Sequence, residues 1–206
     1  QMTQPVRLLF FTLTIDGESC EQTREILDEL APLSANIAIE EVNFLLEADR
    51  ALQYGIDRVP AIAVVGRAES GEVRDSRIRF LGTPSGYEFV SLIRAILLVG
   101  GGPSQLSPES RVRLAAVDRP VTVHVFTTPT CPHCPPAVLL AYRLALASPL
   151  VRASAVEANE FPTYADAHGV LAVPRISVGG TSWEGAVPER VLVDRVLAAA
   201  GAGSGT

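Results

Sequence analysis

The sequence contains no lysine, because all 17 of its basic residues are arginines, and these are scattered along the 206-residue chain. Its 23 acidic residues give a formal net charge of −6. Proteins that follow a phosphate backbone usually carry a basic stripe, and this sequence has none. We therefore expect no nucleic-acid partner.

Long hydrophobic runs are also missing. The longest candidate, Val90 to Val99, is interrupted by Ser91 and Arg94, whereas a membrane span needs roughly 18 to 20 apolar residues. The first residues, Gln1 to Pro5, lack the charged and apolar regions of a signal peptide. We therefore expect no membrane partner and a cytoplasmic location, with a leader removed earlier as the alternative.

Nucleotide-binding motifs are absent too. No G-x-G-x-x-G follows a strand, so the sequence offers no flavin or nicotinamide site and we expect no cofactor. Electrons for any redox chemistry would then come from another protein or from a small thiol.

Cysteine is rare, with Cys20, Cys131 and Cys134 as the three examples. This number is too small for a disulfide-stapled secreted scaffold, but the three-residue spacing of the last two is typical of redox or metal chemistry. A zinc site needs about four ligands. A second cysteine pair is missing and His124 and His168 are not at a convincing ligand spacing, so we expect no metal and favour redox chemistry.

The chain is 48% hydrophobic and long enough for one large domain or two small ones. Its sequence is also internally repeated. The pairs Cys20 and Cys134, Gly55 and Gly169, and Pro60 and Pro174 are each separated by 114 positions. Three landmarks that share one offset indicate a duplication.

Each half predicts the element order β-α-β-α-β-β-α. Short apolar runs bounded by turn residues are typical of buried strands, and stretches with charges between apolar residues are typical of helices. The expected strands include residues 7–14, 36–44 and 61–65 in the first half and 121–128, 152–158 and 175–178 in the second. The expected helices include residues 20–30 and 87–99, then 137–147 and 187–200.

Between the halves, Ser107 and Pro108 predict the N-cap and first residue of a short linker helix. We therefore divide the chain into a first unit (1–102), a linker helix (103–119) and a second unit (120–206). Right-handed crossovers favour parallel pairing within each βαβ portion, and the terminal hairpin adds antiparallel strands. The fold class is α/β with a mixed sheet.

The Cys131-Pro132-His133-Cys134 motif lies between a predicted strand and a predicted helix that we expect to start near Pro132. Cys131 would then stand at the helix N-terminus, where unpaired N–H groups and the helix dipole stabilise a thiolate. We expect Cys131 to attack a substrate disulfide and Cys134 to resolve the mixed disulfide. Pro132 suits the first helical position, and a charged His133 would stabilise the thiolate further and make the pair a better oxidant.

Val173-Pro174 stands immediately before a predicted strand. A proline there frees the preceding backbone from a regular ladder, so Val173 could pair with an extended substrate segment beside the dithiol. A cis bond does not follow from the residues alone, because only about 5–6% of X-Pro bonds are cis.

These motifs resemble the protein disulfide oxidoreductase (glutaredoxin-like) family of thermophilic archaea and bacteria, over nearly the whole chain. The residues that carry the match are 127–135, 156–158 and 169–174 in the second unit and 55–60 and 80–84 in the first. The resemblance implies two tandem thioredoxin-like units with a three-layer α/β/α architecture. It also implies a cis bond at Val173-Pro174, Cys131 as the nucleophile and Cys134 as the resolving thiol.

One departure from that family concerns the first unit, where Gly17 occupies the nucleophile position and only Cys20 remains. A lone cysteine cannot perform dithiol exchange, which puts in doubt any isomerase activity that needs two sites. This pattern is similar to the N-terminal domain of the alkyl hydroperoxide reductase flavoprotein, which has two thioredoxin-like units and a single active dithiol that passes electrons to a peroxiredoxin.

Several other residues allow more than one interpretation. Glu157 ends a predicted buried strand and could accept the proton of Cys134, although a surface ion pair is the simpler account. Cys20 is either a small apolar helix residue or a partner-bridging thiol. We expect His124 to be a hydrogen-bonded core residue and His168 a surface residue. Trp183 is expected to pack in the core or at the sheet edge.

Three functions remain open. The first is a thiol-disulfide oxidoreductase that acts on protein dithiols and disulfides. The second is an electron carrier between a thioredoxin-reductase-like flavoprotein and a peroxiredoxin. The third is an adaptor or chaperone whose first unit binds a partner, and it predicts that activity on a model disulfide survives deletion of residues 1–100.

Overall fold

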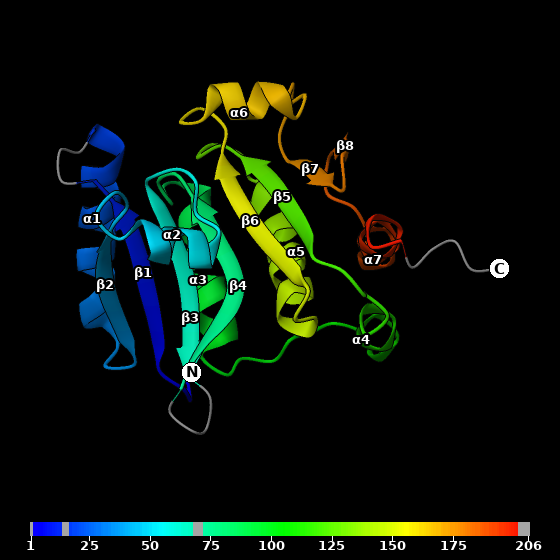
Figure 1. Cartoon of the computed structure of the whole chain (residues 1–206), viewed down its shortest axis with the longest axis horizontal. Helices are drawn as coiled ribbons and strands as arrows, with labels where there is room; N and C mark the ends of the chain where they lie inside the picture. The colour runs from blue at the N-terminus through cyan, green and yellow to red at the C-terminus, as the bar shows by residue number, and fades with distance from the viewer. Residues whose placement is uncertain (1, 14–16, 68–71, 202–206) are drawn as a thin grey trace.

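The computed structural model describes residues 2–13, 17–67 and 72–201, which form one eight-stranded mixed sheet with helices on both faces (Figure 1). The predicted α/β architecture is therefore confirmed. The elements are β1 (Val6–Thr12), α1 (Glu18–Leu30), a 3-10 turn η1 (Ala31–Leu33), β2 (Ile37–Asn43), α2 (Ala48–Tyr54), β3 (Ala61–Arg67), β4 (Val73–Leu81), α3 (Tyr87–Val99), α4 (Pro108–Leu114), β5 (Val121–Thr127), α5 (Cys134–Ala147), β6 (Val151–Glu157), α6 (Pro162–Ala167), β7 (Arg175–Val178), β8 (Thr181–Glu184) and α7 (Glu189–Ala199).

The two halves of the sheet have the same strand order. The first half runs β2-β1-β3-β4 and the second runs β6-β5-β7-β8, each with one parallel pair followed by two antiparallel pairs. Each half also has the predicted element order, with α4 between the two. The exact division of the chain into units stays a prediction.

The sequence did not predict that the two halves share one sheet. Strands β4 and β6 pair in parallel from Ile78 opposite Ala153 to Leu81 opposite Val156. Across this seam the buried hydroxyl of Tyr142 in α5 donates to the carbonyl oxygen of Arg79 in β4, at 3.0 Å. Helices α3 and α5 pack against each other over the same seam.

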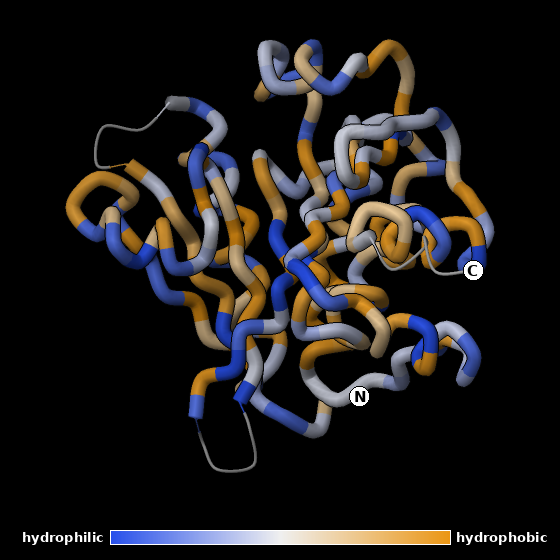
Figure 2. The backbone as a smooth tube through the Cα atoms, turned by 45° about the vertical axis from the view of Figure 1, so that its right-hand side comes forward, coloured by the Kyte–Doolittle hydropathy of each residue, from blue (hydrophilic) through white to orange (hydrophobic). Residues whose placement is uncertain are grey.

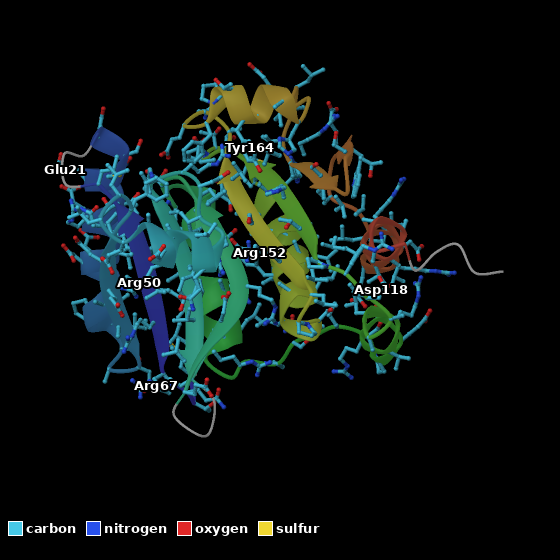
Figure 3. The ribbon with its side chains drawn as sticks, viewed as in Figure 1. Glu21, Arg50, Arg67, Asp118, Arg152 and Tyr164 are labelled. Carbon is cyan, nitrogen blue, oxygen red and sulfur yellow. A yellow bond between two sulfur atoms is a disulfide. The ribbon has the colours of Figure 1, made fainter. Side chains whose placement is uncertain are left out.

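Two apolar cores lie on the two faces of the sheet. Helices α1, α3, α5 and α7 cover one face and share a core that crosses both halves of the chain. The short helices α2 and α6 cover the other face, over a smaller core. Figure 2 shows hydrophobic stretches, in orange, along the strands and helices of both halves. Figure 3 labels Tyr164 on α6 and Arg152 on β6, which both belong to the side of the sheet with the smaller core.

Most predicted boundaries agree with the structure to within one or two residues. Ser107 caps α4 as expected, because its hydroxyl accepts the backbone N–H of Ser110 at 3.1 Å. The expected end of the first strand at Thr14 lies outside the described residues. The main error concerns the active helix, which begins at Cys134 instead of near Pro132.

No helix among the described residues has the length and hydropathy that crossing a membrane would require.

Candidate active site

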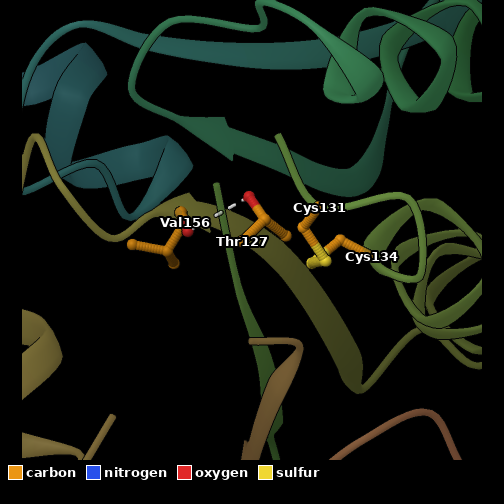
Figure 4. Close-up of a disulfide and its surroundings, with 4 residues drawn as sticks. All are labelled: Thr127, Cys131, Cys134 and Val156. Atoms are coloured by element: carbon orange, nitrogen blue, oxygen red, sulfur yellow. Dashed lines mark hydrogen bonds between the residues drawn. A yellow bond between two sulfur atoms is a disulfide. The ribbon is translucent and has the colours of Figure 1, made fainter. Parts of the chain in front are cut away.

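The candidate site lies where β5 ends and α5 begins. After Thr127 the chain turns, with the Cys131 N–H donating to the Thr128 carbonyl at 3.1 Å and the Cys134 N–H donating to the Cys131 carbonyl at 3.4 Å. These bonds bring the two cysteines to a Cα–Cα distance of 5.5 Å, and a disulfide joins them. Figure 4 shows the disulfide beside Thr127, whose hydroxyl donates to the Val156 carbonyl.

Pro132 does not occupy the first helical position that the sequence suggested. Helix α5 starts with Cys134, and Pro135 and Pro136 follow in its first turn. These two prolines lack the N–H groups that would otherwise go unpaired at a helix start, so they define the N-terminus better than Pro132 does. Cys131 therefore lies in the turn just before α5, while Cys134 is part of the helix.

The two sulfur-bearing residues differ in exposure. Cys131 is 7% exposed and Cys134 is 0% exposed, while Pro132 and His133 between them are both exposed. A macromolecular disulfide can therefore approach only Cys131 without rearrangement of the helix. His133, at the N-cap of α5, makes no side-chain cap bond within the described part of the chain and stands next to the dithiol on the surface.

The Val173-Pro174 peptide bond is cis. Pairing of β5 with β7 places Arg175, the first residue of β7, opposite Phe126 near the end of β5. Val173 and Pro174, which precede Arg175, therefore lie at the same end of the sheet as Cys131. The Pro174 carbonyl accepts the N–H of Gly185 at 2.8 Å. The Val59-Pro60 bond in the first half is also cis, although that half has no dithiol.

The expected surface ion pair of Glu157 is wrong. Glu157 is 2% exposed and its carboxylate accepts the backbone N–H of Glu160 at 2.6 Å and the side-chain amide of Asn159 at 2.9 Å. It lies opposite Thr127 in the pairing of β5 with β6, so it shares the sheet end that carries the dithiol. Burial raises the pKa of Glu157.

Sequence reasoning missed a second buried carboxyl, Glu88 in the first turn of α3. It is 1% exposed, and neither carboxylate oxygen has a hydrogen-bond partner among the described residues. Burial raises the pKa of Glu88 to about 7. The preceding residue, Tyr87, donates its N–H to the Pro129 carbonyl at 2.9 Å, which ties this turn of α3 to the loop before Cys131.

A signal for Glu88 was present in the sequence. Glu88 falls on the helical face that also carries Leu92, Ala95 and Ile96, and that face is buried. A glutamate in a first helical turn is nevertheless common on the surface, because the helix dipole favours it there. For this reason the sequence did not predict that Glu88 is buried.

The remaining singled-out residues lie away from the disulfide. His124 shares a hydrogen bond with the Tyr164 hydroxyl at 3.2 Å. His168 is half-buried, and its Nδ1 lies 2.9 Å from the Tyr164 carbonyl oxygen. Trp183 packs partly against the larger core on β8, the edge strand, as expected. Cys20 is buried in α1 and lies outside the disulfide. Within the described ranges no group of three or more His, Cys, Asp or Glu residues could hold a metal ion.

Comparison with protein families gives a match to most of the second half of the chain. Residues 121–198 match the family model of the thioredoxin domain. This range contains β5 through most of α7, and therefore the disulfide and the cis-proline.

Solved structures of the same architecture cover nearly the whole chain. A protein disulfide oxidoreductase from Aeropyrum pernix is similar with a TM-score of 0.88 and 28% identity, covering 98% of this chain and 88% of that one. The N-terminal (NTD_N/C) domain of alkyl hydroperoxide reductase from Enterococcus faecalis is similar with a TM-score of 0.85 and 27% identity, covering 95% and 92%. The thioredoxin-like fold and both resemblances that the sequence indicated are therefore confirmed.

Curated relatives point the same way. The alkyl hydroperoxide reductase of Pseudomonas putida is 28% identical over 180 residues, which are 87% of this chain and 31% of that protein. The NADH dehydrogenase of Bacillus subtilis is 24% identical over 92% of this chain and 33% of its own length. This chain thus spans about a third of the curated relatives that it matches.

Proposed function

We propose that this chain is a thiol–disulfide oxidoreductase whose Cys131–Cys134 pair exchanges disulfides with protein substrates. The thioredoxin-domain match of its second half, its similarity to a protein disulfide oxidoreductase and the disulfide itself support this proposal. The observation that carries the assignment of roles is the difference in exposure: Cys131 has accessible surface and Cys134 has none. Cys131 is therefore the nucleophile and Cys134 the resolving thiol.

The reaction balances as two thiol–disulfide exchanges. The Cys131 thiolate attacks one sulfur of a substrate disulfide, forms a mixed disulfide and displaces the other substrate sulfur as a thiolate. Cys134 then loses its proton and attacks the Cys131 sulfur, which restores the internal disulfide and releases the second substrate thiolate. Two electrons pass to the substrate, and the two released thiolates take up two protons. The structure holds the oxidised form, from which the same steps run in reverse.

The two buried carboxyl groups at this end of the fold supply the proton chemistry. A resolving thiol with no accessible surface needs a nearby base, because solvent cannot take its proton directly. Burial raises the pKa of Glu88 to about 7 and also raises the pKa of Glu157, and a carboxylate with a raised pKa is a stronger base for taking up a proton. We propose that one of these two carboxylates, at the same end of the sheet as the dithiol, accepts the proton of Cys134.

The backbone around the cis-proline positions the substrate. Val173 and Pro174 immediately precede β7, at the end of the sheet where Cys131 lies. An extended substrate segment can add to this backbone by strand-like hydrogen bonds, which holds its disulfide in line with Cys131.

Cys134→Ser is expected to accumulate a mixed disulfide with a model protein substrate, because the first exchange proceeds and the second cannot. Cys131→Ser is expected to accumulate none and to lose exchange activity altogether. Non-reducing electrophoresis and mass spectrometry of the trapped species measure both outcomes. Cys20→Ser serves as the matched control and should turn over like the parent protein. Trapping by Cys131→Ser at a yield equal to Cys134→Ser would contradict the assigned roles.

His133→Ser is expected to lower the reduction potential of the pair by roughly 10 to 30 mV. A charged imidazole beside the dithiol stabilises the thiolate and hence the reduced form, and the effect is small because His133 is exposed. Equilibration with glutathione measures it. An unchanged potential in His133→Ser would exclude this role.

A second candidate function is delivery of electrons to a peroxiredoxin from a thioredoxin-reductase-like flavoprotein. The similarity to the alkyl hydroperoxide reductase of Pseudomonas putida over 87% of the chain favours it. A reduction potential near −270 mV would support such a reductase, and one near about −120 mV would support an oxidant that introduces disulfides into proteins.

A further inference from the structure

The sheet face opposite α5 is only partly covered in the second half of the chain. Helix α6 has six residues, and it packs over the end of the sheet near Phe126 and Val156. In Figure 1, α6 lies at the upper end of β5 and β6, and no helix crosses the nearer face of these strands below it.

The uncovered part of this face is polar. His124 pairs with Ser177, and Ser177 pairs with Ser182, so these three side chains share one face of neighbouring strands. Thr122 and Arg175 lie on the same face two residues along their strands. In the first half of the chain, by contrast, β1 presents Leu9 and Phe11 to the corresponding face, and both are buried in the core under α2.

These side chains line a cavity of about 610 Å³, together with His168 and the turn at Gly179 and Gly180. A cavity of this size lies within the usual range for small-molecule sites. Its lining is unlike most such sites, because hydroxyl, imidazole and guanidinium groups predominate.

Arg175 is the charged group of the cavity. Its Nη2 and Nε donate to Ser182 Oγ at 2.8 and 3.1 Å, which fixes the guanidinium plane. Its ion pair with Glu184 is long, at 3.3 Å, and the Glu184 side chain is 48% exposed. The guanidinium is thus held in place by a neutral hydroxyl and only weakly neutralised.

His124 is the second polar group of interest in this cavity. Burial first, and then electrostatic interaction with His168 and Arg58, lower the pKa of His124 to about 4, against an opposing effect of Asp57. Its Nδ1 is buried without a hydrogen-bond partner in the part of the chain that the structure describes. Buried polar groups in native proteins normally have partners, so this nitrogen, on a residue that lines the cavity, is a hydrogen-bonding position that the described residues leave unfilled.

We propose that this cavity binds a small oxyanion-bearing molecule, with its phosphate or carboxylate group on Arg175. The Nε and Nη2 edge of the guanidinium already faces Ser182 Oγ, so the oxyanion would take the remaining N–H groups of Nη1 and Nη2. Neighbouring hydroxyls such as Ser177 can donate to the other oxygens. The site is separate from the dithiol, because it lies on the opposite face of the sheet from α5. It does not depend on the proposed exchange reaction.

The three histidines allow a direct test, since His124 and His168 line the cavity and His133 stands beside the dithiol. Imidazole NMR signals of the full chain are followed during titration with inorganic phosphate and, separately, with acetate, each at constant ionic strength maintained with chloride. We expect His124 and His168 signals to shift along a saturating curve with at least one anion while His133 does not. The anion that saturates at the lower concentration identifies the head group.

Arg175→Gln is expected to weaken this binding at least tenfold. Arg190→Gln, at an exposed position of α7, is the matched control and should leave it unchanged. Ser177→Val provides a second variant that keeps the arginine, and thermal unfolding establishes that each variant is folded. Shifts that do not saturate, equal shifts at all three histidines, or full affinity in Arg175→Gln would overturn the proposal.

Discussion

Deleting residues 1–100 is expected to leave a second half that no longer unfolds cooperatively, and disulfide exchange by that fragment should fall to the level of an unstructured dithiol peptide. The reason is the seam between β4 and β6. Removing the first half would expose the β6 edge, together with the face of α5 that packs against α3. An unpaired, apolar edge strand is also an aggregation site.

A single buried arginine at this seam tests the same idea without truncation. Arg79 is 1% exposed, and its guanidinium donates to Asp75 at 2.6 and 2.8 Å and to the Tyr54 carbonyl at 2.8 Å. Arg79→Met leaves the Asp75 carboxylate and the Tyr54 carbonyl without this donor. Removal of one partner of a fully buried ion pair costs roughly 3–5 kcal/mol. Because the Asp75 side chain is 31% exposed and partly screened by solvent, we expect the lower end of this range, about 3 kcal/mol.

Urea unfolding, followed by far-UV circular dichroism and by exchange activity, measures the effect. Arg79→Met should lower the unfolding free energy by that amount and should lower it for both halves together, whereas Arg94→Met, at an exposed position of α3, should change little. A fragment of residues 101–206 that unfolds cooperatively and retains exchange activity would contradict this prediction. It would also support the adaptor hypothesis, in which the first unit only binds a partner.

The repeat made much of this fold predictable. The shared offset of 114 positions, the apolar strand runs and the Ser107 cap located nearly all elements, because each depends on local patterns of hydropathy or on turn chemistry. The seam was not predictable in this way. Pairing of β4 with β6 joins residues that are distant in the sequence, such as Ile78 and Ala153, and neither strand carries a local signal for its neighbour.

The candidate site was predictable to a similar degree. The Cys131 and Cys134 spacing and the strand-turn-helix context located the disulfide from sequence alone. The helix start was misplaced because Pro132, Pro135 and Pro136 all suit a first turn, and sequence alone does not rank them. Burial of Glu157 depends on how the β6 end meets the other strands, which is tertiary information.

The second large effect concerns pH, because Glu88 and His124 titrate with opposite consequences for stability. The pKa of Glu88 is raised to about 7 from an ordinary value near 4.5. The folded state therefore holds a proton that the unfolded state loses, and the free energy of unfolding falls as pH rises from about 4.5 to about 7. The full change is about 3 kcal/mol.

The pKa of His124 is lowered to about 4 from an ordinary value near 6.5, so the unfolded state is the one that binds the extra proton. Its contribution is present above about pH 6.5 and is lost as pH falls towards 4, again with a full change of about 3 kcal/mol. Between about pH 4.5 and 6.5 the two slopes oppose each other. From these two groups alone, the parent protein should show little change of stability in this window.

Single variants should separate the two opposing pH dependences of the unfolding free energy. In Glu88→Gln the unfolding free energy should rise with pH between about 4.5 and 6.5, because only the His124 contribution remains. In His124→Leu it should fall with pH over the same window, because only the Glu88 contribution remains. Urea unfolding at half-unit pH intervals from 4 to 8 measures the slopes, and comparison of slopes cancels any constant cost of the substitution itself. A Glu88→Gln variant that keeps the parent's pH dependence would contradict the prediction. The clearest support would come from the difference in unfolding free energy between variant and parent. This difference should be about 3 kcal/mol more favourable to the variant above about pH 7 than at pH 4.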